Sequence, residues 1–170
     1  MDLKALIRDV PDFPSPGIVF KDITPLLQDP GAVRHAVSLL ADRYRAGGVD
    51  AVVGIESRGF IFGVPLALEL GASFAPARKA GKLPRETVSA EYALEYGSAL
   101  MELHADAIAP GRRVLLADDV LATGGTMAAA RELVTRLGGE VVGAAVLMEL
   151  GFLDGRGKLD GLDVFSLIRY

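Results

Sequence analysis

The chain of 170 residues contains no cysteine, which excludes disulfide bonds, thiolate nucleophiles and cysteine-ligated zinc sites. Its two histidines, His35 and His104, lie far apart without metal-ligand spacing. Aromatic residues make up only 6% of the chain and hydrophobic residues 51%, so we expect an aliphatic core. The formal net charge of -4 gives no electrostatic footprint for nucleic acid, so we expect no nucleic-acid partner, and an acidic ligand must be bound by a local basic cluster.

No hydrophobic run has the length of a membrane-spanning helix. The most apolar window, residues 59–68, is about half the ~20 residues that a span needs, and Pro65 interrupts it. Residues 1–9 mix acidic and basic side chains and lack the apolar stretch of a signal peptide. We therefore expect a cytoplasmic protein that does not bind membranes.

Strand-like and helix-like segments alternate along the chain, whose length favours one domain, residues 1–170. We expect helices at residues 2–10, 31–46, 59–70 and 127–137. We expect strands at residues 51–55, 73–77, 114–117, 140–148 and 162–168, and a hairpin at residues 92–103. Repeated strand–loop–helix units predict an α/β fold, a twisted parallel sheet flanked by helices on both faces.

Two segments interrupt this alternation. Residues 11–24 hold three prolines and a glycine, which predicts an extended, stiffened loop. Residues 78–91 are basic, contain glycine and proline and show no periodicity, which predicts a flexible loop. Because ligands of parallel sheets bind at the carboxyl ends of the strands, a site is expected near Arg58, Arg78 and Asp118, which each follow an expected strand.

The clearest motif is VLLADDVLATGGTM, at residues 114–127. Its loop opens the following helix and consists of Ala122, Thr123, Gly124, Gly125 and Thr126. The glycines let backbone N–H groups turn toward one point, the threonine hydroxyls add donors, and the helix dipole favours an anion. The loop lacks the lysine of a Walker A loop and the GxGxxG order of a dinucleotide fingerprint. We therefore expect it to bind one phosphate monoester, in preference to a nucleoside triphosphate or NAD.

Asp118 and Asp119 precede this loop, and two carboxylates there would repel a phosphate unless the ligand also offers hydrogen-bond donors. Vicinal sugar hydroxyls are such donors, because an ionised carboxylate only accepts hydrogen bonds. A divalent cation near the same sugar would ease the repulsion further. The alternative is that Asp119 caps the helix and TGGT is an ordinary turn. The buried strand before the loop and the helix after it favour a ribose 5-phosphate site.

The motif resembles the 5-phosphoribosyl 1-pyrophosphate signature of the type I phosphoribosyltransferases, and ADDVLATGGT is most similar to the adenine-specific branch. The resemblance extends over residues 11–170 and includes the segments PDFPSPGIVFKDITPLL, ESRGFIFG, RKAGKLP, LEYG and FSLIRY. It implies the type I phosphoribosyltransferase fold, with a small hood formed by residues 1–30. It also implies transfer of the 5-phosphoribosyl group to adenine, giving AMP and pyrophosphate, with Mg²⁺ held mainly by the substrate, in a homodimer.

By the same resemblance, the residues that contact pyrophosphate would be Ser57, Arg58, Arg78, Lys79 and Lys82. A surface arginine at a strand end and an ordinary solvated basic loop are the alternative explanations. The leaving pyrophosphate carries several negative charges that need cations, Mg²⁺ among them, which gives the basic cluster a chemical role. The loop at residues 78–91 would be the lid of the site.

The resemblance assigns adenine recognition to Val19, Phe20, Lys21 and Val120. The Phe20 ring would stack on the base, main-chain groups of Val19 and Lys21 would read its edge, and Val120 would form the opposite wall. Packing in the core is the alternative for Phe20. Glu95, in the LEYG segment, would assist proton transfer as N9 of the base attacks; a glutamate on an exposed hairpin is the alternative.

Two other functions fit parts of the sequence. A 6-oxopurine phosphoribosyltransferase, acting on hypoxanthine or xanthine, would meet the reverse donor and acceptor pattern on its base, and the VFKDI and LEYG segments speak against it. A non-catalytic regulator that senses the ribose pyrophosphate would carry an added DNA-binding domain. The net charge of -4 and the length of the chain fit such a regulator poorly.

Overall fold

The computed structural model describes residues 1–94 and 97–170 of the chain. Its strands are β1 (Arg8–Pro11), β2 (Val19–Asp22), β3 (Ala51–Ile55), β4 (Ser73–Lys79), β5 (Thr87–Ala93), β6 (Ser98–His104), β7 (Arg113–Leu121), β8 (Glu140–Glu149) and β9 (Val164–Arg169). Its helices are α1 (Thr24–Leu27), α2 (Pro30–Tyr44), α3 (Gly59–Leu70) and α4 (Gly125–Arg136). Short 3-10 turns are η1 (Lys4–Leu6), η2 (Arg45–Gly47), η3 (Gly151–Leu153) and η4 (Gly155–Lys158).

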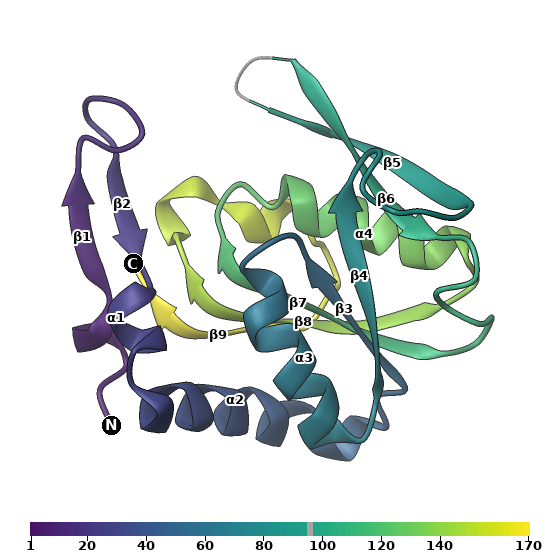
Figure 1. Cartoon of the computed structure of the whole chain (residues 1–170), viewed down its shortest axis with the longest axis horizontal. Coiled ribbons are helices and arrows are strands. Elements are labelled where there is room, and N and C mark those ends of the chain that lie inside the picture. The colour runs from purple at the N-terminus through teal and green to yellow at the C-terminus, as the bar shows by residue number, and fades with distance from the viewer. Residues whose placement is uncertain (95–96) are drawn as a thin grey trace.

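The main sheet has the strand order β5-β6-β4-β3-β7-β8-β9 (Figure 1). The run from β4 to β9 is parallel, and the β5–β6 hairpin adds two antiparallel strands beside β4. Alternate residues of β3 face opposite layers: Val52 packs with α2 and α3, and Val53 packs with α4. Helices therefore cover both faces of the sheet, which confirms the predicted α/β architecture.

Local sequence signals explain where the main helices begin and end. The Asp29 side chain accepts hydrogen bonds from the Gly31 and Ala32 N–H groups and so caps α2. Gly71, with φ of 64°, ends α3 in the left-handed conformation. Within the described ranges, no helix combines the length and hydrophobicity needed to cross a membrane.

Four segments differ from the sequence prediction. Residues 11–24, expected to be a loop, include β2. Residues 2–10, expected to be helical, form η1 and then β1, because β1 pairs with β2 in a separate antiparallel hairpin. Residues 78–91, expected to form one irregular loop, include the end of β4 and the start of β5, which pairs with β6. Asp118 and Asp119, expected to follow the strand at residues 114–117, lie within β7, where Asp118 pairs with Val146 of β8.

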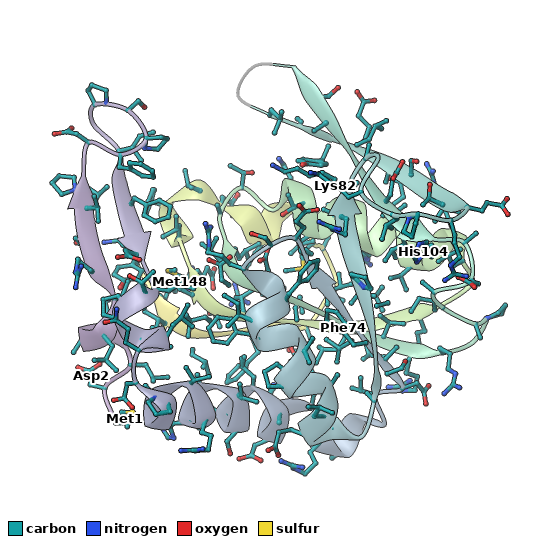
Figure 2. All side chains as sticks on the ribbon, viewed as in Figure 1. Met1, Asp2, Phe74, Lys82, His104 and Met148 are labelled. Carbon is teal, nitrogen blue, oxygen red and sulfur yellow. The ribbon has the colours of Figure 1, made fainter. Side chains whose placement is uncertain are left out.

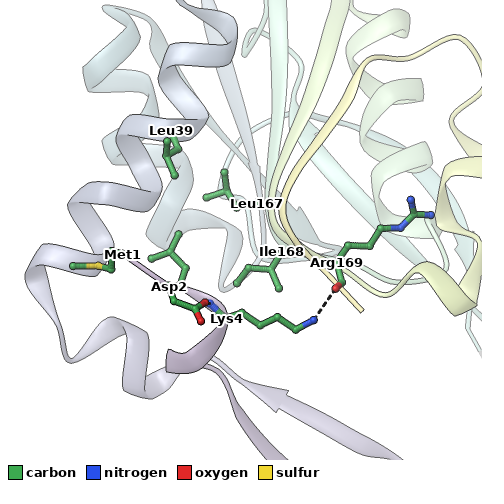
Figure 3. Close-up of a pocket in the computed structure, with 8 residues that line it drawn as sticks. Met1, Asp2, Lys4, Leu39, Leu167, Ile168 and Arg169 are labelled. Atoms are coloured by element: carbon green, nitrogen blue, oxygen red, sulfur yellow. Dashed lines mark hydrogen bonds between the residues drawn. The ribbon is translucent and has the colours of Figure 1, made fainter.

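The N-terminal segment is attached to β9 by two lysines. Lys4 Nζ donates a hydrogen bond to the Arg169 carbonyl at 3.0 Å, beside a cavity of about 280 Å³ (Figure 3). The Nζ atoms of Lys4 and Lys21 lie 4.3 and 4.1 Å from the centre of the Tyr170 ring. These cation–π contacts connect β2, which carries Lys21, to the end of the main sheet.

Candidate active site

A cleft of about 870 Å³ opens at the carboxyl ends of the central parallel strands, where ligands of such sheets bind. In Figure 1 the β1–β2 hairpin and the β5–β6 hairpin stand on either side of these strand ends. The cleft is lined by residues 55–58, residues 92–94, residues 118–126, Ile18, Lys79, Leu153 and Lys158. Segments that are far apart in the sequence therefore converge on one site.

The loop from Ala122 to Thr126 lines this cleft, as the motif predicts. Gly124 has a φ of 79°, a left-handed conformation that glycine adopts without steric cost, and α4 begins at the next residue. No side chain in the described part of the chain caps the first turn of α4. Its N–H groups can therefore bind an anion, which the helix dipole further favours.

Asp118 and Asp119 are among the few buried charged residues, with 8% and 3% of their surfaces exposed. The Asp119 N–H donates a hydrogen bond to Asp118 Oδ1 at 2.8 Å, and Arg58 Nε donates to Asp119 Oδ2. Burial, and then the neighbouring Asp119 charge, raise the pKa of Asp118 well above its usual value. Burial thus favours the uncharged form of Asp118, and the Arg58–Asp119 ion pair reduces the negative charge that a phosphate would meet.

Close packing brings α3 against the acidic pair. A Cβ atom on Gly59, the first residue of α3, would lie 2.9 Å from Asp118 Oδ1 and 2.9 Å from the Ala117 carbonyl. Only glycine therefore lets α3 begin this close to β7. The same approach places Arg58, which precedes Gly59, within reach of Asp119.

Glu56 organises the basic residues at the end of β4. Its Oε2 atom accepts hydrogen bonds from Arg78 Nε at 3.2 Å and from the Lys79 N–H at 3.0 Å. Burial raises the pKa of Glu56, but these hydrogen bonds and the positive charge of Arg78 and Lys82 outweigh it, so the pKa is lowered overall. The Glu56–Ser57 peptide bond is cis.

The structure brings together part of the expected pyrophosphate set. Ser57, Arg58 and Lys79 line the cleft. Arg78 and Lys82 do not line it, although Arg78 Nη1 donates a hydrogen bond to the Lys82 carbonyl at 3.3 Å. Figure 2 shows Lys82 beyond the end of β4, beside the β5–β6 hairpin.

The expected adenine contacts are also only partly at the cleft. Val120 lines it, whereas Val19, Phe20 and Lys21 do not. The centre of the Phe20 ring lies 5.6 Å from the guanidinium carbon of Arg58, which lines the cleft, and the ring packs edge-on against Phe13. Glu95, the expected proton-transfer residue, lies outside the described residues.

Nine other residues line the cleft that the sequence interpretation had not placed there: Ile18, Ile55, Glu56, Tyr92, Ala93, Leu94, Leu121, Leu153 and Lys158. Ile18 directly precedes the expected base-binding residues, so the sequence could have predicted that it lines the cleft. Leu153 and Lys158 come from η3 and η4, which follow β8. Their sequence carries no phosphate-binding pattern that would have pointed to the site.

Comparison with known proteins gives consistent matches. The model of the phosphoribosyl transferase domain matches residues 22–164. The adenine phosphoribosyltransferase of Thermobifida fusca is 58% identical over 161 residues, which cover 95% of this chain and 92% of that relative. The crystal structure of the adenine phosphoribosyltransferase from Thermoanaerobacter pseudethanolicus has a TM-score of 0.97 and 51% identity, covering 99% of this chain and 98% of the other. The Saccharomyces cerevisiae adenine phosphoribosyltransferase, solved with adenine and an imino-altritol bisphosphate, has a TM-score of 0.94 and 44% identity, covering 98% and 96%.

Proposed function

The chain belongs to the adenine phosphoribosyltransferases of the phosphoribosyltransferase family, and we propose that the cleft beside β7 is its active site. The enzyme transfers the 5-phosphoribosyl group from 5-phosphoribosyl 1-pyrophosphate to adenine, giving AMP and pyrophosphate. It is therefore a pentosyltransferase. The observation that carries the site assignment is the uncapped start of α4 beside a buried acidic pair.

The ribose 5-phosphate would bind along β7 and the loop that follows it. The 5-phosphate accepts hydrogen bonds from the N–H groups and hydroxyls of Ala122, Thr123, Gly124, Gly125 and Thr126. Asp118 and Asp119 bind the ribose hydroxyls, which are the donors that carboxyl oxygens require. Support comes from the cleft, which both the loop and the acidic pair line.

Pyrophosphate would bind on the side of β3 and β4, at Ser57, Arg58, Arg78, Lys79 and Lys82. As N9 of adenine attacks C1 of the ribose, the bond from C1 to the pyrophosphate oxygen breaks and positive charge builds on the sugar. The basic residues stabilise the departing charge, and the carboxylates stabilise the sugar. Glu56 would hold Arg78 and the Lys79 main chain in position.

Adenine would bind between Phe20 and Val120, with the main chain of Val19 and Lys21 at its edge. The place of Phe20 beside Arg58 supports a base near the ribose site. The Saccharomyces cerevisiae relative was solved as a complex with adenine, which supports the choice of base. Glu95 remains the predicted proton-transfer residue.

Mg²⁺ is the expected cofactor, bound mainly by the ribose pyrophosphate. The described residues include no group of three or more side chains able to hold a metal, and the carboxyl groups that line the cleft belong to Glu56, Asp118 and Asp119. This donor set fits a cation that takes its other oxygen ligands from substrate and water. The homodimer and the cytoplasmic location also remain predictions.

The two other functions considered from the sequence are not favoured. Relatives that are 55–58% identical over 95–100% of the chain are named adenine phosphoribosyltransferases. Neither a 6-oxopurine enzyme nor a non-catalytic regulator receives comparable support.

Asp119→Asn tests the assignment of the acidic pair. We expect a loss of roughly 10- to 150-fold in kcat/KM for the ribose pyrophosphate, because a charged hydrogen bond contributes about 1.5–3 kcal/mol. Inorganic phosphate, which has no hydroxyl groups to bind, should inhibit more strongly, because one repelling charge is gone and Arg58 is released from its ion pair. If the variant binds both ligands more weakly, Asp119 merely shapes the loop and the assignment is wrong.

A further inference from the structure

The segment from η3 to η4, Gly151 to Lys158, forms a second wall of the phosphate loop. A Cβ atom on Gly124 would lie 2.3 Å from the Gly155 carbonyl oxygen, and one on Gly155 would lie 2.3 Å from the Ala122 carbonyl oxygen. Neither position tolerates a side chain without movement of the backbone. The phosphate loop and this segment are therefore in direct main-chain contact.

An ion pair with a buried carboxylate holds the segment in place. Glu149, at the end of β8, has a side chain that is 3% exposed. Its two oxygens accept hydrogen bonds from Arg156 Nε at 2.8 Å and Arg156 Nη2 at 2.7 Å, and Ser166 Oγ adds a third at 2.9 Å. Arg156 Nη1 also donates to the Val164 carbonyl at 2.9 Å. This bidentate arrangement fixes η4 between β8 and the phosphate loop.

The phosphate loop supplies no positive charge of its own. Its residues are Ala, Thr and Gly, and the charged residues that precede it, Asp118 and Asp119, are acidic. The cationic side chains that line the cleft are Arg58, Lys79 and Lys158. Arg58 forms an ion pair with Asp119. Lys79, the last residue of β4, donates a main-chain hydrogen bond to Glu56. Lys158 lies in η4, the turn that touches the loop, and forms no ion pair with a carboxylate in the described part of the chain.

We propose that Lys158 binds the 5-phosphate of the ribose, and that the Glu149–Arg156 pair positions it. This inference rests on the proposed function, since it takes the phosphate loop as the 5-phosphate site. Lys158 supplies the cation that the loop lacks, and an ammonium group beside backbone N–H donors makes a charge-assisted phosphate contact. The lowered pKa of Glu149, caused chiefly by the hydrogen bonds from Arg156, keeps that carboxylate ionised and the pair intact at neutral pH.

Lys158→Met is the primary test, with product inhibition as the readout. The inhibition constant of AMP, which carries the 5-phosphate, should rise by roughly 10- to 150-fold, as for the loss of one hydrogen bond to a charged group. The inhibition constant of pyrophosphate should stay unchanged. The KM for the ribose pyrophosphate should rise more than kcat falls, because the 5-phosphate takes no part in bond breaking.

Two control variants sharpen this test. Lys158→Arg keeps the charge and should retain most of the AMP affinity. Arg34→Met removes the same charge from an exposed position on α2 and should change neither constant. Unchanged AMP inhibition in Lys158→Met, or equal weakening of AMP and pyrophosphate, would overturn the inference. Absence of AMP formation by the unaltered enzyme would instead refute the proposed function.

Coupling between Arg156 and Lys158 tests the positioning role. Arg156→Lys loses the bidentate contact with Glu149 and should raise the AMP inhibition constant in the presence of Lys158. In the Lys158→Met background the same change should have little further effect, because the side chain to be positioned is missing. Equal effects of Arg156→Lys in both backgrounds would mean that the ion pair serves stability alone.

Discussion

At the scale of single residues, buried charge is concentrated at one edge of the sheet. The buried charged side chains of the described chain are Asp118, Asp119 and Glu149, at the carboxyl ends of β7 and β8. Burying a charge costs free energy unless partners compensate for it. Arg58 and Arg156 are those partners for Asp119 and Glu149, whereas Asp118 has a raised pKa. The site is therefore built at a cost to stability.

The pH dependence of the stability of Asp118→Asn, compared with that of the unaltered protein, should reveal this cost. Because the folded pKa of Asp118 is raised, the native state binds this proton more tightly than the unfolded chain. Stability is therefore lost as the pH rises from the ordinary value of about 3.9 toward the folded pKa. Without ligand, the Asn variant should have a higher Tm than the unaltered protein at neutral pH, by about 2–4 °C for each kcal/mol gained in the free energy of unfolding. In acid the two Tm values should be the same. Calorimetry across this pH range checks it; a gain independent of pH would contradict it.

The phosphate loop could be predicted from the sequence because its residues are contiguous and its chemistry is local. Lys158 could not be predicted in the same way. Its link to the loop is a main-chain contact between Gly124 and Gly155, which no residue pattern indicates. Phe20 shows the intermediate case: the motif places it near the base, but side-chain packing against Phe13 decides where its ring lies.

At the scale of elements, the β1–β2 hairpin carries the expected base-binding residues and depends on the main sheet for its position. Tyr170→Leu removes the ring that the Lys4 and Lys21 ammonium groups approach. Each exposed cation–π contact contributes about 0.5–1 kcal/mol, so we expect the KM for adenine to rise by several-fold. The KM for the ribose pyrophosphate should change little. Tyr170→Phe keeps the ring and should behave as the unaltered enzyme; an equal effect of both variants would exclude the cation–π explanation.

Elements with a strong hydrophobic pattern of their own could be predicted from the sequence. Strands that form because a neighbouring strand pairs with them could not. The strand at Ala51–Ile55 and the helix at Gly59–Leu70 have the bounds that hydrophobic runs and terminal glycines indicate. β1 and β5 have weak patterns of their own and are strands because β2 and β6 lie beside them. Such pairing is a tertiary effect that overrides local propensity.

At the scale of the whole molecule, one face of α3 favours the predicted homodimer. Ile61, Val64 and Leu68 follow helical spacing and are 40%, 42% and 77% exposed. Leu68→Lys places a charge in this face without disturbing the core and should shift the protein toward monomer in analytical ultracentrifugation. Phe152→Lys, at a comparably exposed site in η3, is the matched control and should leave the assembly unchanged. If the unaltered protein is a monomer, or if the Leu68→Lys variant is still a dimer, α3 does not form the dimer interface.

The base selectivity of the unaltered enzyme is the most direct measurement of the central claim, that one cleft joins a ribose 5-phosphate to adenine. The purified protein is supplied with 5-phosphoribosyl 1-pyrophosphate and Mg²⁺, and with adenine, hypoxanthine or xanthine in parallel reactions. We expect AMP and pyrophosphate in equal amounts from adenine, and far slower turnover of either 6-oxopurine. Faster formation of the hypoxanthine or xanthine nucleotide, or no turnover of any base, would contradict the account.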